Sequence, residues 1–119
     1  MKVLVCGGRD FNDVDWLESE LDYLDSRLPE RITLVIEGGA KGADSIAGRW
    51  ADFHKINHLR VPAKWDKYGK SAGYKRNAEM LTFEPDYVLA FPGGKGTKMM
   101  CELARKEGVF VKELADVAK

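Results

Sequence analysis

Phe91-Pro92-Gly93-Gly94-Lys95-Gly96-Thr97 is the stretch that decides the fold of this 119-residue chain. Residues 86–91, which run into it, are apolar enough for a strand buried on both faces. Residues 98–106 after it have the spacing and composition of a helix. Glycines at such a junction let the backbone approach a ligand closely, and they leave unpaired N–H groups that suit an anion such as phosphate. A turn shaped only by packing is the alternative.

Two more glycine turns follow predicted strands earlier in the chain. Residues 2–6 predict a strand that stops at Gly7-Gly8-Arg9-Asp10. Residues 32–36 predict a second strand that stops at Glu37-Gly38-Gly39-Ala40-Lys41-Gly42-Ala43-Asp44. Residues 58–61 and 109–111 predict two further short strands.

Apolar residues at helical spacing predict helices between these strands. Asn12 or Asp13 caps the first helix, which ends at Pro29, and Ser71 caps the third. Gly108 ends the helix that follows the last glycine turn, and a short terminal helix follows the fifth strand. Residues 62–70 are interpreted as an ordered loop over the sheet edge. The core-facing positions are predicted to be Val14, Leu17, Leu21, Leu24, Leu28, Ile46, Trp50, Phe53, Tyr74, Ala78 and Leu81.

Strands that alternate with helices predict an α/β fold, a three-layer Rossmann-like parallel sheet of about five strands with helices on both faces. We expect one domain over residues 1–119. In such sheets ligands bind at the carboxyl ends of the strands, and all three glycine turns follow such ends. The sequence therefore predicts one binding site at that edge.

The composition is that of a water-soluble domain, with 45% hydrophobic and 32% charged residues and a net charge of zero. No apolar run approaches the ~18 residues that cross a membrane. The chain enters its first strand directly after Met1, so we expect a cytoplasmic protein. Cys6 and Cys101 are expected to be reduced, mostly buried thiols, and neither a metal nor a cofactor is expected.

The charge is unevenly distributed along the chain. Residues 10–25 hold seven acids and no Lys or Arg, whereas residues 64–76 hold five bases against one acid, a local net charge of +4. A basic segment beside glycine turns indicates a small anionic ligand, with a solvated surface as the alternative.

Standard phosphate motifs are absent. Gly94-Lys95-Gly96-Thr97 shares only letters with a P-loop. A dinucleotide fingerprint would need Gly or Ala where Met99 stands. His54 and His58 lack a third ligand nearby and are interpreted as structural.

Four motifs together resemble the SLOG superfamily, in particular its small YspA/YpsA-related branch. The motifs cover nearly the whole chain in order: Gly7-Gly8-Arg9-Asp10-Phe11, residues 37–44 as quoted above, Gly73-x-x-Arg76-Asn77, and Pro92-Gly93-Gly94-x-Gly96-Thr97. The superfamily also contains the Lonely Guy phosphoribohydrolases and the Smf/DprA-type domain. The resemblance implies a Rossmann-like domain that binds a nucleotide or a nucleotide-derived ligand.

The Lonely Guy signature is matched only in part. Arg76 fits its Arg, but Asn77 stands in place of its Lys. Thr97 fits its Thr, but the residue three positions later is Met100 where the signature has Glu. Glu102 lies two residues further, about 200° around the helix. The chain therefore lacks the expected carboxylate that would stabilise an oxocarbenium-like transition state.

Several candidate roles keep two interpretations. Arg9 either neutralises an anionic group of the ligand or pairs with Asp10. Asp44 either caps a helix or accepts a hydrogen bond from a ribose hydroxyl. Asn77 binds a base edge or a loop carbonyl, while Trp65 and Tyr68 stack on a base or pack the loop. Glu37 and Arg76 are the catalytic candidates. The candidate ligand-binding residues are Gly7, Gly8, Arg9, Gly38, Gly39, Gly42, Asp44, Trp65, Tyr68, Arg76, Asn77, Pro92, Gly93, Gly94, Gly96 and Thr97.

Three functions compete on the sequence. The preferred one is a module that senses, carries or sequesters a nucleotide-derived small molecule. The second is a hydrolase of a nucleotide glycosidic or phosphate bond, using Glu37. The third is single-stranded nucleic-acid binding through residues 64–76, which zero net charge and small size weaken, so we expect neither nucleic acid nor a membrane as partner. The superfamily also suggests a homodimer, with Trp16, Met99 or Met100 in the contact or the core.

Overall fold

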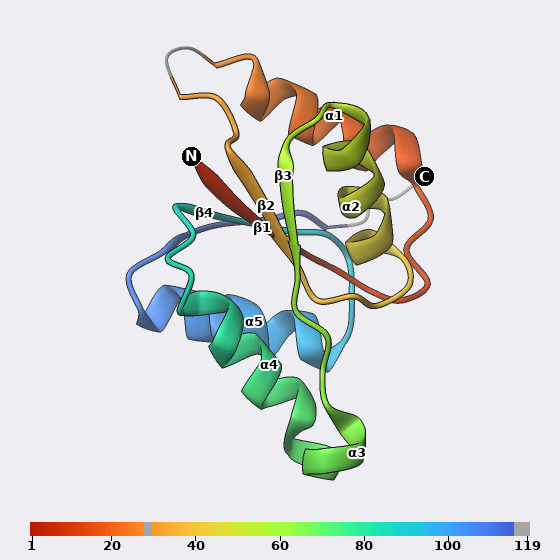
Figure 1. Ribbon diagram of the computed structural model, residues 1–119, viewed down its shortest axis with the longest axis vertical. Coiled ribbons are helices and arrows are strands. Elements are labelled where there is room, and N and C mark those ends of the chain that lie inside the picture. The colour runs from red at the N-terminus through yellow and green to blue at the C-terminus, as the bar shows by residue number, and fades with distance from the viewer. Residues whose placement is uncertain (28–29, 116–119) are drawn as a thin grey trace.

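The computed structural model describes residues 1–27 and 30–115 (Figure 1). Within them, no helix has the length and apolar character needed to cross a bilayer. The elements are β1 (Lys2–Cys6), α1 (Val14–Asp25), β2 (Leu34–Glu37), α2 (Ala43–Phe53), β3 (Asn57–Arg60), α3 (Trp65–Tyr68), the 3-10 turn η1 (Gly69–Ser71), α4 (Ala72–Leu81), β4 (Tyr87–Ala90), α5 (Lys95–Lys106) and β5 (Phe110–Glu113).

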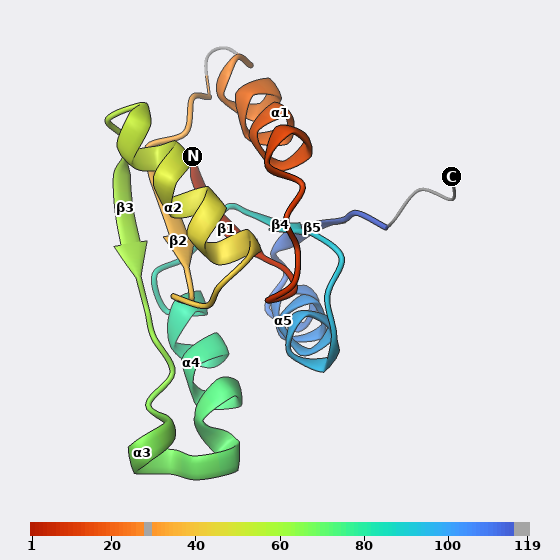
Figure 2. The same cartoon turned by 90° about the vertical axis from the view of Figure 1, so that its right-hand side faces the viewer.

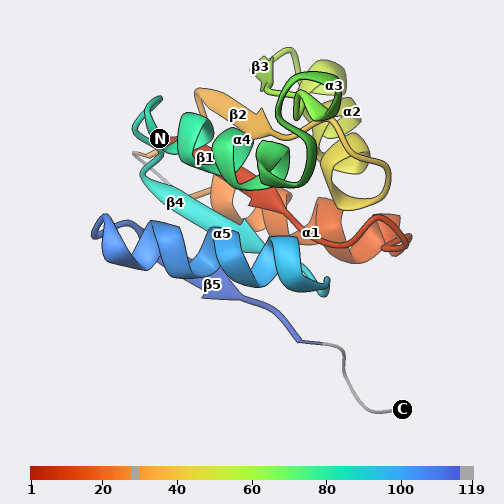
Figure 3. The same ribbon diagram turned by 90° about the horizontal axis from the view of Figure 1, so that it is seen from below.

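The five strands form one sheet in the order β3-β2-β1-β4-β5, and every neighbouring pair is parallel. Helices α1 and α2 cover one face of the sheet, and α4 and α5 cover the other (Figures 1 and 3). The expected three-layer Rossmann-like fold is thus confirmed.

Each face of the sheet has its own apolar core. Val3, Val5 and Val35 point toward α1 and α2, where Leu17 and Trp50 are buried against them. The alternate residues of the same strands point toward α4 and α5, because successive side chains of a strand lie on opposite faces. Cys6 and Cys101 belong to this second core, and both are buried and unbridged, as expected.

The strand order creates a crevice between β1 and β4. The chain runs outward from β1 through β2 to β3, then crosses back to build β4 and β5 on the other side of β1. Cys6 at the end of β1 pairs with Ala90 at the end of β4. The loops that leave these two strands therefore diverge to opposite faces of the sheet. Open α/β sheets bind their ligands in the crevice between such loops.

Helix α1 begins as predicted but ends earlier. The Asp13 carboxylate accepts a hydrogen bond from the amide of Trp16 at 3.1 Å, so Asp13 is the cap. The helix ends at Asp25, and the predicted positions Leu28 and Pro29 lie outside the described residues.

Three other predictions of secondary structure were wrong in detail. The segment 62–70 is not a loop over the sheet edge: it contains the single-turn helix α3 and lies beyond the carboxyl ends of the strands, beside α4 (Figure 2). Helix α5 begins at Lys95, three residues earlier than expected, because Gly94 serves as its N-cap. Residues 112 and 113 continue β5, so no helix starts there, and residues 116–119 are not described.

Three apolar residues assigned to the core are exposed. Phe53 is 82% exposed, Tyr74 is 53% exposed and Val14 is 39% exposed. Each lies at an end or on the outer stripe of its helix, where helical spacing alone does not tell a core position from its neighbour.

Candidate functional site

A cleft of about 1180 Å³ opens where β1 and β4 end. It is bounded by the first and third glycine turns, by the start of α1, and by α4. The residues that line it are Cys6, Gly7, Gly8, Arg9, Asp10, Phe11, Asn12, Asp13, Trp16, Ala40, Asp44, Trp65, Lys70, Gly73, Tyr74, Arg76, Asn77, Met80, Pro92, Gly93, Gly94, Gly96, Thr97, Met99 and Met100. Most of the ligand-binding residues predicted from the sequence therefore line this one cleft.

The first and third glycine turns touch at the floor of the cleft. The amide of Gly8 donates to the carbonyl of Pro92 at 2.9 Å. A Cβ on Gly93 would lie 2.7 Å from the Gly8 nitrogen and would also collide with the Thr97 hydroxyl. Any larger residue at Gly93 would push the two turns apart, so glycine is required here for close approach.

The start of α5 presents backbone N–H groups that have no partner among residues 1–27 and 30–115. Its N-cap, Gly94, makes no side-chain capping bond. The first amide of this turn that bonds within the protein is that of Lys98, which donates to the Gly94 carbonyl at 3.1 Å. Within the described residues, the amides of residues 93–97 have no hydrogen-bond acceptor. This is the arrangement in which helix starts bind anions.

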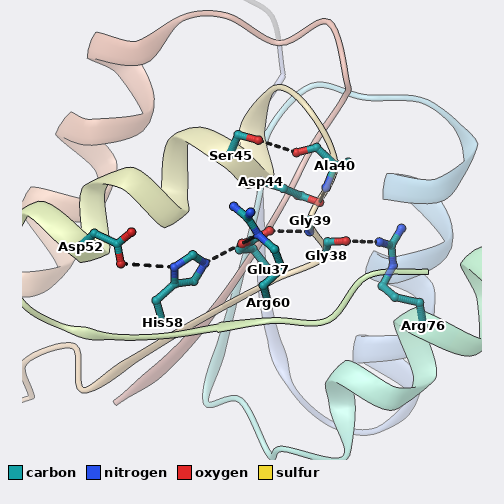
Figure 4. A network of polar contacts seen from close by, with 10 residues as sticks. All are labelled: Glu37, Gly38, Gly39, Ala40, Asp44, Ser45, Asp52, His58, Arg60 and Arg76. Carbon is teal, nitrogen blue, oxygen red and sulfur yellow. Dashed lines mark hydrogen bonds and ion pairs between the residues drawn. The ribbon is translucent and has the colours of Figure 1, made fainter. Parts of the chain in front are cut away.

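Arg76 reaches the cleft from α4 and connects the glycine turns. Its Nη1 donates to the Gly38 carbonyl at 2.6 Å (Figure 4). Its Nε donates to Asn77 Oδ1 at 3.0 Å. Asn77 Nδ2 then donates to the Gly96 carbonyl at 3.3 Å. In the part of the chain that is described, Nη2 of Arg76 has no acceptor, which leaves its two N–H groups for a ligand. Asn77 thus bonds a backbone carbonyl, as one of its two predicted roles has it, but that carbonyl lies in the first turn of α5 and not in a loop.

The second glycine turn lines the cleft through Ala40 and Asp44 but not through its glycines. Gly38, Gly39 and Gly42 are absent from the cleft surface because β2 lies on the far side of β1 from β4. Gly38 instead makes room for the Arg76 guanidinium, and Gly42 lies against the carbonyls of Gly8 and Arg9. These three glycines allow close contacts with other parts of the protein. The expectation that they let the turn pass close under a ligand was wrong.

Glu37 is a structural residue and not a cleft carboxylate. It is fully buried, its Oε1 accepts from the Gly39 amide at 2.5 Å, and its Oε2 contacts His58 Nε2 at 2.5 Å and Arg60 Nε at 2.6 Å (Figure 4). His58 also contacts Asp52 at 3.4 Å. The expectation that Glu37 would be a catalytic carboxylate was wrong, because at the end of β2 its side chain is buried and bonded to Gly39, His58 and Arg60.

Asp44 is the buried carboxylate that does line the cleft. It is not the cap of α2, whose N-cap is Gly42; Asp44 lies in the first turn and its Oδ2 accepts from the Ala40 amide at 3.2 Å. Burial raises the pKa of Asp44 to about 6, and Glu37 adds to the rise, whereas the Ala40 amide and Arg76 lower it. A carboxylate that titrates near neutral pH within a cleft is a typical functional residue.

We predict that Asp44→Asn stabilises the protein at pH 8. A folded-state pKa of about 6 against 3.8 means that ionised Asp44 costs stability, fully so above pH 6 and not at all below pH 4. Asn keeps an acceptor for Ala40, so the gain should be about 3 kcal/mol at pH 8 and should vanish near pH 4. Urea unfolding of both proteins across this range measures it. A gain that does not change with pH would contradict the assignment.

Aromatic side chains stand at both ends of the cleft. Trp65 and Tyr74 line it beside Arg76, but Tyr68 does not and lies over a neighbouring small cavity. At the other end, Trp16 and Phe11 line it, with ring centroids 5.9 Å apart.

Several cleft residues were not predicted from the sequence. Trp16 and the two methionines were assigned to the core or a subunit contact, and all three also line the cleft. Met100 is a buried core residue, as one of these alternatives predicted, and Trp16 packs against the other core while it is partly exposed. The sequence signal that could have placed Trp16 in the cleft is its position in the first turn of the helix that follows the first glycine turn. Arg9 also lines the cleft, and within the described residues no ion pair joins it to Asp10.

Comparison with known proteins gives the family. The model of the YspA, cpYpsA-related SLOG family matches residues 1–68, more than half of the chain. The chain belongs to this family. The matched residues contain the first two glycine turns, so this SLOG domain carries its third turn outside the matched part.

Two similar proteins cover almost the whole SLOG chain. The Gene 61 protein of Mycobacterium phage D29 is 36% identical over 97% of each chain. In fold, the chain is similar to DNA processing protein A (DprA) of Streptococcus pneumoniae, with a TM-score of 0.76 and 19% identity over 98% of this chain. The chain spans half the length of that DprA chain.

Proposed function

We propose that the cleft binds a phosphorylated, nucleotide-derived small molecule. The observation that carries this proposal is the convergence on one hollow of the unpaired amides of residues 93–97 and the Arg76 guanidinium. Amides at a helix start and a guanidinium are the groups that proteins use most readily for phosphate. Membership of the SLOG family supports the same assignment.

The roles within the cleft follow from position. The amides of residues 93–97 and the Thr97 hydroxyl hold the phosphate, and the free Nη2 of Arg76 takes a second oxygen. A base stacks on Trp65 or Trp16, which stand at the two ends of the cleft. Asp44 accepts a hydrogen bond from a hydroxyl of the sugar. A cleft of about 1180 Å³ exceeds the ~300–1,000 Å³ of a typical ligand pocket, so a whole nucleotide has room.

Two measurements test the proposal. Mass spectrometry of small molecules released on denaturing the purified protein should show a phosphate-bearing species with a nucleobase. Titration calorimetry with the four nucleoside 5′-monophosphates should show one preferred compound, with little change in affinity between 50 and 200 mM salt. Failure of all four to bind, with no released ligand, would contradict the proposal.

Hydrolysis of the N-glycosidic bond is a second candidate, and Asp44 favours it. Met100 occupies the place of the Lonely Guy carboxylate and is buried, and Glu37 is sealed away from the cleft. Asp44, with a pKa of about 6, has the properties of a general acid or base at neutral pH. Free base released by the wild type and lost in Asp44→Asn, with binding retained, would establish this activity. Binding without release of base would leave the protein as a binding module.

A further inference from the structure

A basic and aromatic surface lies at the end of the molecule away from α1. We call it the α3–α4 face and define it by Lys64, Lys67, Lys70, Lys75, Trp65 and Tyr68, all of which are exposed. Among the described residues, none of these four lysines pairs with a carboxylate. The face therefore presents four lysines without an ion-pair partner around two aromatic rings, together with one acid, Asp66 of α3.

The zero net charge of the chain conceals a separation of charge along its longest axis. The acidic helix α1 lies at the top of Figure 1 and α3 at the bottom, and the same separation is seen in Figure 2. Two acids of α1 are already paired, Glu20 with Lys112 at 2.8 Å and Asp25 with Arg31 at 2.9 Å. Zero net charge thus no longer argues against a polyanion, because the basic end is far from the acidic one.

A small cavity on this face is suited to a phosphate group. It measures about 250 Å³, is separate from the cleft, and is lined by Lys64, Lys75 and Arg76. The rest of its lining contains one acid, Glu79, so its net charge is positive. Arg76 lines both hollows, so the small cavity and the cleft adjoin at this side chain.

The aromatic rings of the face are partly exposed to solvent. Trp65 is 50% exposed and Tyr68 is 36% exposed. The ammonium groups of Lys67 and Lys75 lie 5.2 and 4.7 Å from the centre of the Tyr68 ring. Aromatic rings bordered by lysines are the pattern by which proteins hold single strands, since bases stack on the rings and phosphates lie on the cations.

We propose that the α3–α4 face binds a single-stranded nucleic acid. The phosphates lie on Lys64, Lys67, Lys70 and Lys75, and unpaired bases stack on Trp65 and Tyr68. This binding goes beyond the small-molecule function of the cleft. The two surfaces share Trp65 and Lys70, which also line the cleft, whereas Lys64, Lys67, Tyr68 and Lys75 belong to the face alone. A duplex is not the partner, because its bases are already stacked on each other and cannot reach the two rings.

Fluorescence anisotropy with a labelled single-stranded dodecamer tests the proposal. Four phosphate contacts on a single strand predict a slope of log K against log[salt] of about −2.8, which is about a 50-fold loss of affinity between 50 and 200 mM salt. Absence of binding at 50 mM salt would overturn the proposal. So would equal affinity for inorganic polyphosphate or for duplex DNA, which would leave the aromatic rings without a role.

Variants that spare the cleft separate this proposal from the function of the cleft. Lys64, Lys67 and Lys75 do not line the cleft. Changing all three to Ala should reduce the salt slope to about −0.7 and should leave mononucleotide binding unchanged. The same three changed to Arg should retain strand binding. Lys106→Ala, at the end of α5, is the matched control and should have no effect.

Two single variants guard against loss of fold in the triple variant. Tyr68→Ala should weaken strand binding about 10-fold through loss of one stacked base. Lys67→Glu reverses one exposed charge and should weaken binding with a smaller salt slope. Strand binding that survives the triple Ala change, with an unchanged circular dichroism spectrum, would overturn the proposal whatever the cleft binds.

Discussion

Gly42→Ala is expected to destabilise the protein by about 4 kcal/mol, the largest effect of any single substitution considered. Gly42 has a φ of +78°, which costs a residue with a side chain about 1–2 kcal/mol. Its new Cβ would also lie 2.6 Å from the Arg9 carbonyl and collide with the Gly8 carbonyl, and overpacking against backbone costs about 1–3 kcal/mol more. Urea unfolding followed by circular dichroism measures the loss.

Gly108→Ala is the matched control for this prediction. Gly108 has nearly the same φ, +79°, but a Cβ there would meet nothing within 4 Å. It should cost about 1 kcal/mol, because only the backbone strain remains. Equal losses in the two variants would mean that the contact between the second and first glycine turns contributes nothing to stability.

Arg76→Ala is expected to weaken nucleotide binding about 100- to 300-fold. The change removes the guanidinium that the Gly38 carbonyl and Asn77 hold in the cleft, and charge-assisted bonds to phosphate are the stronger class. Arg76→Lys should recover part of the affinity, since a lysine keeps the charge but not the planar fork. Calorimetry with the tightest-binding nucleoside 5′-monophosphate measures both.

Lys75→Ala controls for a general loss of positive charge on α4. Lys75 is adjacent in sequence but lines only the small cavity, so mononucleotide affinity should not change. Thermal melting of each variant checks that the fold is kept. An Arg76→Ala variant that is folded and binds within threefold of the wild type would remove Arg76 from the site.

The sequence predicted the sheet and the edge that carries the cleft, because these depend on local signals. The apolar run Lys2–Cys6 gives β1 without error, and Asp13 caps α1 as its residue type indicates. The first and third glycine turns meet because the parallel strands β1 and β4 are neighbours. The alternation of strands and helices favours this pairing but does not by itself fix it.

The parts that the sequence did not predict depend on contacts between distant residues. The burial of Glu37 depends on His58 and Arg60, 21 and 23 residues away, and nothing local distinguishes it from a cleft carboxylate. Gly38 and Gly42 share their residue type and local pattern with the cleft glycines, and only the strand order places them behind the first turn. Helix α3, with four residues, is too short to show a helical period.

The central claim is that the unpaired amides of residues 93–97 and the side chain of Arg76 receive a phosphate. Titration of the ¹⁵N-labelled protein with the preferred nucleoside 5′-monophosphate, followed by amide and Arg Nε resonances, tests it most directly. We predict that the largest shifts fall on residues 93–97, on Gly8, and on the Arg76 side chain. Shifts confined to other surfaces, or none at millimolar ligand, would contradict the claim.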